Sequence, residues 1–183
     1  MGTNIQYRID YEKTIEAIVW LANKAPGIDI YHVSKILYYA EKLHLNRYER
    51  PIIGDTYIAM PYGQVPSGVR DLITKNTWVI DPKDLAQFSA SVETQKDPYD
   101  KLTALRSANL DFFSDTDIEC LNEAFGYYVN MTFDQLKEIS HQDKSWIETE
   151  QNKEIDYRLM LDDNEYKNEL LEDICKTSHY VRF

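Results

Sequence analysis

The stretch of sequence that decides the fold spans residues 31–73 and reads YHVSKILYYAEKLHLNRYERPIIGDTYIAMPYGQVPSGVRDLI. Its first part predicts a helix, because apolar residues recur there at the spacing of one helical face. These inward residues are Val33, Ile36, Leu37 and Ala40. Asp29 stands just before them as a suitable N-cap, so the helix is expected to run from there to about residue 45. After Arg50 the apolar residues stand among prolines and glycines, which predicts short strands or extended segments.

Upstream of this stretch, residues 10–24 predict another helix, which Pro26 and Gly27 end. The two helices would form either a helical hairpin or a helix-turn-helix. A helix that reads the major groove usually presents several Arg, Lys, Asn or Gln side chains. The second helix offers only Lys35 and Lys42 as such cations, so the sequence disfavours DNA recognition.

Downstream, the pattern predicts a third helix over residues 65–73 and then a polar region. Residues 83–98 are weakly patterned and are expected to form a loop or a short helix. Alternating apolar residues between 102 and 112 predict a small hairpin, with its turn at residues 107–109.

The C-terminal part of the chain predicts further helices. Ser114 is the expected N-cap of one, and Thr132 with Gln135 forms a capping-box pattern at the start of another. Alternation over residues 155–161 is compatible with a strand, and residues 163–176 read as a final helix. The predicted fold class is therefore α+β and mainly α-helical: a compact helical domain with a small antiparallel β-sheet or hairpin.

Charge is spread unevenly along the 183 residues, whose net charge is −11. Residues 1–80 carry nine Lys/Arg against eight Asp/Glu, whereas residues 81–183 carry eleven against twenty-three. Such acidity opposes binding to phosphate backbones, so a nucleic-acid partner is not expected. It either serves solubility alone or favours encounter with a basic protein.

No cofactor or metal is expected. Cys120 and Cys175 are the only cysteines and lie far apart, which is neither a disulfide framework nor a zinc pattern. His32, His44 and His141 lack the spacing and the glutamate of a zinc-protease helix, so no catalytic residue is predicted among them. The chain shows no signal peptide or membrane-spanning run, and a cytoplasmic location is expected.

Several short motifs resemble one known family. The segment Arg50-Pro51-Ile52-Ile53-Gly54-Asp55-Thr56-Tyr57 resembles the Arg-Pro-Ile-x-Gly-Asp-x-Tyr pattern of the Panacea, or SocA-like antitoxin, domain. Tyr62-Gly63-Gln64-Val65-Pro66 resembles that family's Tyr-Gly-Pro-Val-Pro turn and departs from it at Gln64, where proline is usual. Further along, Ser114-Asp115-Thr116-Asp117 and the series Leu136, Ser140-His141 and Trp146 resemble its later motifs. The matching part covers residues 31–146.

The resemblance implies an antitoxin of a prokaryotic or phage-borne toxin–antitoxin system, of the kind also found in phage-associated GepA-type proteins. Such a protein would neutralise a cognate toxin by direct protein–protein binding, and the charge suggests a basic toxin. An alternative is a proteolytic adaptor that delivers the toxin to a cellular ATP-dependent protease. A hydrolase with a site near Asp55, Tyr62 and His141 is an alternative of another class, although no spacing demands an enzyme.

The implied partner-binding candidates lie within the matched motifs: Asp55, Tyr57, Tyr62, Gln64, Val65, Pro66, His141 and Trp146. Each also has a structural interpretation. Asp55 could close the turn at Gly54 through backbone N–H groups, and Gly63 and Pro66 could fix the loop before the third helix. The expected organisation is an antitoxin domain over residues 1–149, followed by an acidic extension over residues 150–183 that packs on it.

Overall fold

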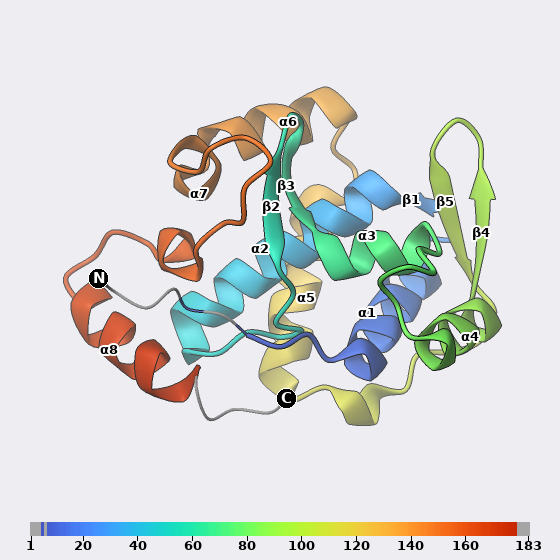
Figure 1. The fold of residues 1–183 in the computed structure, drawn as a ribbon, viewed down its shortest axis with the longest axis horizontal. Helices are drawn as coiled ribbons and strands as arrows, with labels where there is room; N and C mark the ends of the chain where they lie inside the picture. Colours follow the sequence, from blue (N-terminus) through green and yellow to red (C-terminus); the bar gives the residue numbers. More distant parts are fainter. Residues whose placement is uncertain (1–4, 6, 179–183) are drawn as a thin grey trace.

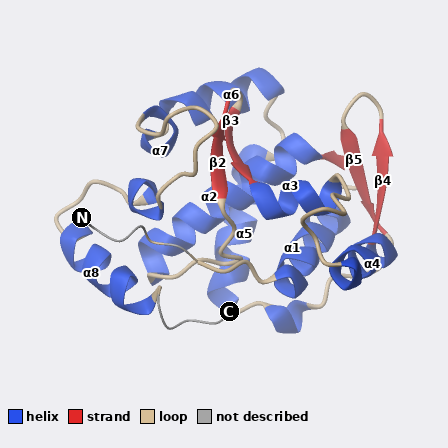
Figure 2. Cartoon of the chain, viewed as in Figure 1, coloured by secondary structure: helices blue, strands red, loops and turns tan. Residues whose placement is uncertain are grey.

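The computed structural model describes residue 5 and residues 7–178 of the chain (Figure 1). The helices are α1 (Tyr11–Lys24), α2 (Ile30–Tyr48), α3 (Ser67–Ile73), α4 (Pro82–Ser91), α5 (Asp115–Tyr128), α6 (Phe133–Gln142), α7 (Lys144–Ile147) and α8 (Lys167–Thr177). The strands are β1 (Ile28–Asp29), β2 (Tyr57–Met60), β3 (Gly63–Pro66), β4 (Val92–Lys96) and β5 (Asp100–Ala104), and the 3-10 helices are η1 (Leu110–Phe112) and η2 (Tyr157–Met160). The mainly helical α+β fold class is confirmed (Figure 2). None of the helices in this described part is long and apolar enough to cross a bilayer.

Helix α2 forms the centre of the molecule, and its predicted inward face is fully buried. It packs against α5 along one side and against the β2–β3 hairpin, α3 and α6 along others. Helix α8 and the β4–β5 hairpin lie at opposite ends of the long axis (Figure 1). A single cluster of buried apolar side chains runs from Ile5 to Ile174.

Two small antiparallel sheets flank this core. One has the strand order β1-β5-β4, with Leu102 of β5 opposite both Ile28 and Thr94. The other is the β2–β3 hairpin, in which Tyr57 lies opposite Pro66. Residues 152–155 run along the outer edge of β2: Ala59 N donates to Lys153 O at 3.0 Å, and Ile155 N donates to Tyr57 O at 2.8 Å.

The predicted helix starts are confirmed where a side chain caps the helix. Asp29 accepts from His32 N at 2.8 Å, and Ser114 and Thr132 each begin a reciprocal capping box. The box at Ser114 is completed by Asp117, whose Oδ2 accepts from Ser114 N at 2.9 Å. The Asp117 side chain therefore completes the capping box, although it is one methylene shorter than the usual Glu.

Three predictions about strands and boundaries were wrong. The hairpin is formed by β4 and β5, not by residues 102–112, and residues 110–112 form η1 instead. Strand β4 is an edge strand with mostly exposed polar side chains, so it lacks the apolar alternation that marks a half-buried strand. Residues 157–160 form η2, whose N-cap Asp156 accepts from Arg158 N at 3.0 Å, rather than a strand. The third helix begins only at residue 67, because Val65 pairs with Ile58 in the hairpin.

Motifs that are distant in the sequence meet in space. The Arg50 guanidinium donates to Ser114 Oγ at 2.8 Å and lies 3.0 Å from Asp117 Oδ1. In the middle of α2, Tyr38 OH lies 2.6 Å from Ser145 Oγ and Lys42 Nζ lies 2.8 Å from Asp143 Oδ2. These contacts fasten α5 and α7 to the central helix.

The turn between α2 and β2 is held by a buried carboxylate. Glu41 Oε2 accepts from Ile52 N at 2.7 Å and from Ile53 N at 3.1 Å, and Oε1 accepts from Gly54 N at 2.8 Å. Tyr157 OH adds a fourth bond to Oε1 at 3.2 Å. Burial raises the pKa of Glu41, and the donated hydrogen bonds oppose that rise.

We expect Glu41→Gln to lower the free energy of unfolding by about 2–4 kcal/mol. Both carboxylate oxygens face donors, so the amide NH2 of glutamine would meet N–H or O–H groups in either orientation. Urea unfolding followed by tryptophan fluorescence measures the change. The control Glu93→Gln, on the exposed face of β4, should stay within about 0.5 kcal/mol of the wild type. Equal stabilities for the two variants would contradict the assigned role of Glu41.

Candidate functional site: an aromatic groove

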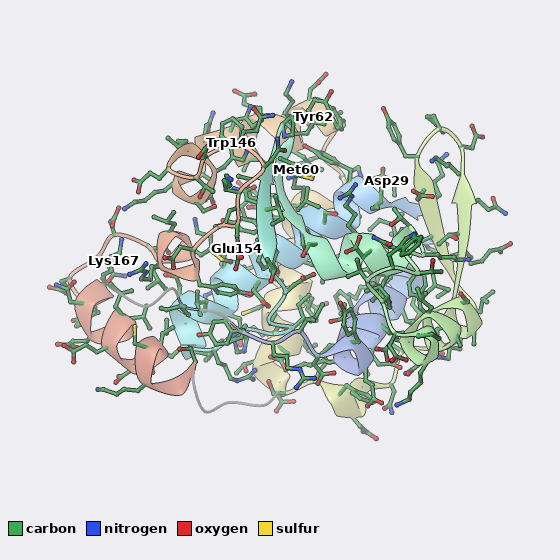
Figure 3. All side chains as sticks on the ribbon, in the orientation of Figure 1. Asp29, Met60, Tyr62, Trp146, Glu154 and Lys167 are labelled. Atoms are coloured by element: carbon green, nitrogen blue, oxygen red, sulfur yellow. The ribbon has the colours of Figure 1, made fainter. Side chains whose placement is uncertain are left out.

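A groove of about 370 Å³ lies where the start of α2, the β2–β3 hairpin, α3, the β4–β5 turn and the start of α6 converge. Its lining residues are Asp29, Ile30, Tyr31, His32, Ser34, Met60, Tyr62, Val65, Arg70, Tyr99 and Phe133. Figure 3 labels Met60 and Tyr62 at the tip of the β2–β3 hairpin and Asp29, the N-cap residue of α2. Few of these groups are charged, so the groove is mainly apolar and aromatic.

The aromatic walls of the groove contact one another. The ring centres of Tyr31 and Phe133 lie 4.4 Å apart. The ring of Tyr62 lies edge-on to that of Phe133, with 5.4 Å between the ring centres. Tyr31 OH donates to Tyr62 O at 2.8 Å, which ties α2 to the hairpin tip. The side chains nevertheless stay accessible, with exposures of 55% for Tyr62, 63% for Tyr99 and 37% for Phe133. Exposed aromatics that gather around one hollow are typical of a protein-binding site.

The hairpin that carries Tyr62 is held from below by buried polar groups. Lys35 Nζ donates to Gln64 O at 2.8 Å, and burial lowers the pKa of this amine to about 7. The side-chain amide of Gln64 donates to Ser145 Oγ at 3.3 Å. Gln64 therefore joins the hairpin to α7 through its side chain.

Gly63 allows the close approach of this hairpin to α2 and α6. Its φ of 108° lies in a region that side chains rarely adopt. A Cβ at this position would lie 2.4 Å from Ser140 Cβ and 2.5 Å from Lys35 Nζ. The turn thus needs glycine for both backbone and packing reasons.

His32 joins the start of α2 to the segment before α6. Its Nδ1 lies 2.8 Å from Asp29 Oδ2 and its Nε2 lies 2.8 Å from Met131 O. Both partners are acceptors, so only the doubly protonated imidazolium satisfies both contacts. The hydrogen bond to the Asp29 carboxylate raises the pKa of His32, which favours that charged form.

The predicted candidates fall into three groups. Tyr62 and Val65 line the groove. His141 and Trp146 lie beside the groove, and their stacked rings have centres 3.9 Å apart. Trp146 Nε1 donates to Met60 O at 2.8 Å. The remaining candidates are buried beneath the surface: Asp55, Tyr57, Gln64 and Pro66.

Asp55 binds helix α3 rather than a partner-facing surface. Its carboxylate oxygens accept from Gly68 N and Val69 N, each at 2.9 Å, and burial raises its pKa to about 7. His141 has a different partner, since its Nε2 lies 3.0 Å from Pro61 O. The structure therefore gives no joint hydrogen-bond network to the three residues of the hydrolase alternative. Within the described ranges no group of three or more His, Cys, Asp or Glu could hold a metal ion.

The sequence did not single out Tyr31, Tyr99, Phe133 or Arg70 as site residues. Tyr31 and Phe133 lie at the starts of amphipathic helices, where an aromatic side chain is expected to pack at the edge of the core. Tyr99 lies in a polar turn whose hairpin was misplaced. One signal in the sequence was available. Phe133 directly follows the N-cap Thr132, and an apolar side chain at the first position of a helix packs against other elements rather than against its own helix.

The chain belongs to the antitoxin SocA-like family with a Panacea domain, whose sequence model matches residues 33–147. The match begins within α2 and ends with α7, so it contains most of the groove. The expected membership is thus confirmed. Neither the curated proteins nor the solved structures give a match.

Gly63→Ala should lower the free energy of unfolding by about 2–4 kcal/mol, because both the positive φ and the contact with Ser140 become unfavourable. Gly126→Ala is the matched control. It lies inside α5 with nothing within 4 Å of its added Cβ, so we expect a gain of about 0.5–1 kcal/mol. Chemical denaturation of both variants measures the two shifts. A Gly63→Ala protein as stable as the wild type would show that the hairpin approaches α2 less closely.

The link through His32 should make stability depend on pH. Because its pKa is raised in the folded state, its contribution is fully present below the unfolded value of about 6.5 and is lost as pH rises through the folded value. We therefore expect the difference in Tm between wild type and His32→Gln to be largest at about pH 6 and below, and to shrink as the pH is raised toward alkaline values. Thermal unfolding across this range measures it. A difference that grows toward alkaline pH would mean that His32 is neutral when folded.

Proposed function

We propose that this protein is an antitoxin that neutralises a cognate protein toxin by binding it directly, and that the aromatic groove is its contact surface. Membership of the antitoxin SocA-like family supports the general role. The observation that supports the groove as the contact surface is that the exposed side chains of Tyr62, Tyr99 and Phe133 line the same hollow. Binding energy in protein interfaces concentrates on such aromatic side chains in central pockets.

The acidic surface supports a basic toxin as the partner. Residues 81–183 carry a net charge of −12 and residues 1–80 one of +1, and the acidic part would speed the encounter with a positively charged protein. We further propose that residues 150–183 belong to the same functional unit as residues 1–149. Tyr157, Met160 and Leu161 lie in the common buried cluster, and this supports one unit.

Co-expression with the toxin tests this proposal. The candidate toxin is the product of the neighbouring gene, and the readouts are growth and the affinity of the purified complex. We expect wild type to restore growth and Tyr62→Ala/Phe133→Ala to weaken binding by about 30-fold or more. Tyr127→Ala/Tyr166→Ala is the matched control, since both of its tyrosines are exposed outside the groove.

Two outcomes would contradict the proposal. Growth arrest despite soluble, folded wild-type protein would remove the antitoxin role against that toxin. Equal affinities for the groove variant and the control variant would move the contact surface elsewhere. Measuring the toxin half-life in the same cells separates sequestration, which leaves it unchanged or longer, from delivery to a protease, which shortens it.

A further inference from the structure

Arg70 places an uncompensated positive charge in the wall of the groove. It lies on α3, it is exposed, and within residues 7–178 its guanidinium has no hydrogen bond or ion pair. Four other arginines of residues 7–178 are paired with carboxylates, whereas Arg8, which lies outside the groove, is not. These pairs are Arg47 with Glu123, Arg50 with Asp117, Arg106 with Glu16 and Arg158 with Asp156.

The carboxylate in the groove wall does not neutralise Arg70. Asp29 accepts from His32 N at 2.8 Å and lies 2.8 Å from His32 Nδ1, so its charge is already compensated by a cation. Hydrogen bonds from His32 lower the pKa of Asp29, although burial opposes this. Asp134, close to the aromatic wall, lies in the first turn of α6, where the helix dipole stabilises it.

A second cation borders the aromatic wall. Lys137 Nζ lies 5.4 Å from the centre of the Tyr62 ring. The groove therefore combines an apolar aromatic floor with cations at its margin, although the chain as a whole is strongly acidic. This local charge is opposite in sign to the overall charge, so solubility does not explain it.

We propose that the groove binds a short segment of the partner protein in which an aromatic or branched aliphatic residue stands next to an Asp or Glu. This inference rests on the proposed function and specifies what its contact surface recognises. The apolar side chain would enter the groove and pack against the exposed side chains of Tyr62, Tyr99 and Phe133. The neighbouring carboxylate would pair with Arg70, whose planar guanidinium suits two parallel hydrogen bonds to such a group.

The two charge effects act at different ranges. The acidic surface acts on the partner as a whole and raises the rate of encounter, whereas Arg70 selects one residue at short distance. A basic toxin with an acidic residue beside one of its apolar anchors would satisfy both. Pairing with Arg70 would then set the register of the segment and so contribute specificity.

Selection of peptides from a phage-displayed random library on the full chain tests the inference without any toxin. We expect wild type to enrich peptides with an acidic residue beside an aromatic or branched aliphatic residue. Arg70→Glu should change the preferred charge to Lys or Arg and lower the affinity for a wild-type-selected peptide by at least about tenfold. Lys153→Glu is the matched control, because this exposed lysine also lacks a side-chain ion pair in the described chain and lies outside the groove.

The outcomes are decisive in each direction. Lys153→Glu should select the same peptides as wild type, and Phe133→Ala should lose them. The inference is overturned by an unchanged charge preference in Arg70→Glu, by peptides that bind Phe133→Ala equally well, or by no enrichment at all. Neutralisation of the toxin together with an unchanged preference would leave the antitoxin role standing. Selection as expected without neutralisation would instead leave the groove specificity standing and remove that toxin as its partner.

Discussion

The buried carboxylate of Glu41 is the interaction on which the rest of the structure depends. It lies on the central helix and accepts three successive backbone N–H groups from residues 52–54, which have no partner in a helix or strand. A buried N–H without an acceptor is costly, so this one side chain fixes the path of the chain from α2 into β2. The hydroxyl of Tyr157, from the C-terminal part, lies 3.2 Å from Glu41 Oε1 and 2.7 Å from Asp55 O, so these two acceptors share its one proton. The same carboxylate therefore also fastens residues 150–161 to the core.

This arrangement separates the residues that build the fold from those that form its surface. Asp55 caps α3 and Gly63 admits the hairpin between α2 and α6, so both act on the backbone. Their effect is to hold Tyr62 at an exposed position beside Phe133. A groove held in this way is preorganised, and a partner would lose less conformational entropy on binding it.

Helices and caps were predictable from the sequence because their signals are local. Asp29, Ser114 and Thr132 each cap a helix through atoms within three residues. Strand β4 was not predictable, since an exposed edge strand needs no apolar alternation. The groove was predicted only in part: Tyr62 and Val65 lie in a matched motif, but the other walls come from the start of α2, α3, α6 and the β4–β5 turn. Their convergence is a property of tertiary packing, and no local pattern encodes it. Other motif residues, such as Asp55 and Tyr57, are buried, so at these positions the sequence pattern reflects the architecture.

We propose above all that this protein contacts its partner through the aromatic groove. Amide hydrogen exchange of the full chain, with and without the candidate toxin, tests this most directly. Protection should appear in residues 29–34, 60–65 and 131–134, which surround the groove, while α8 at the far end exchanges unchanged (Figure 1). Protection centred on α5 or α8, with none around the groove, would contradict the account.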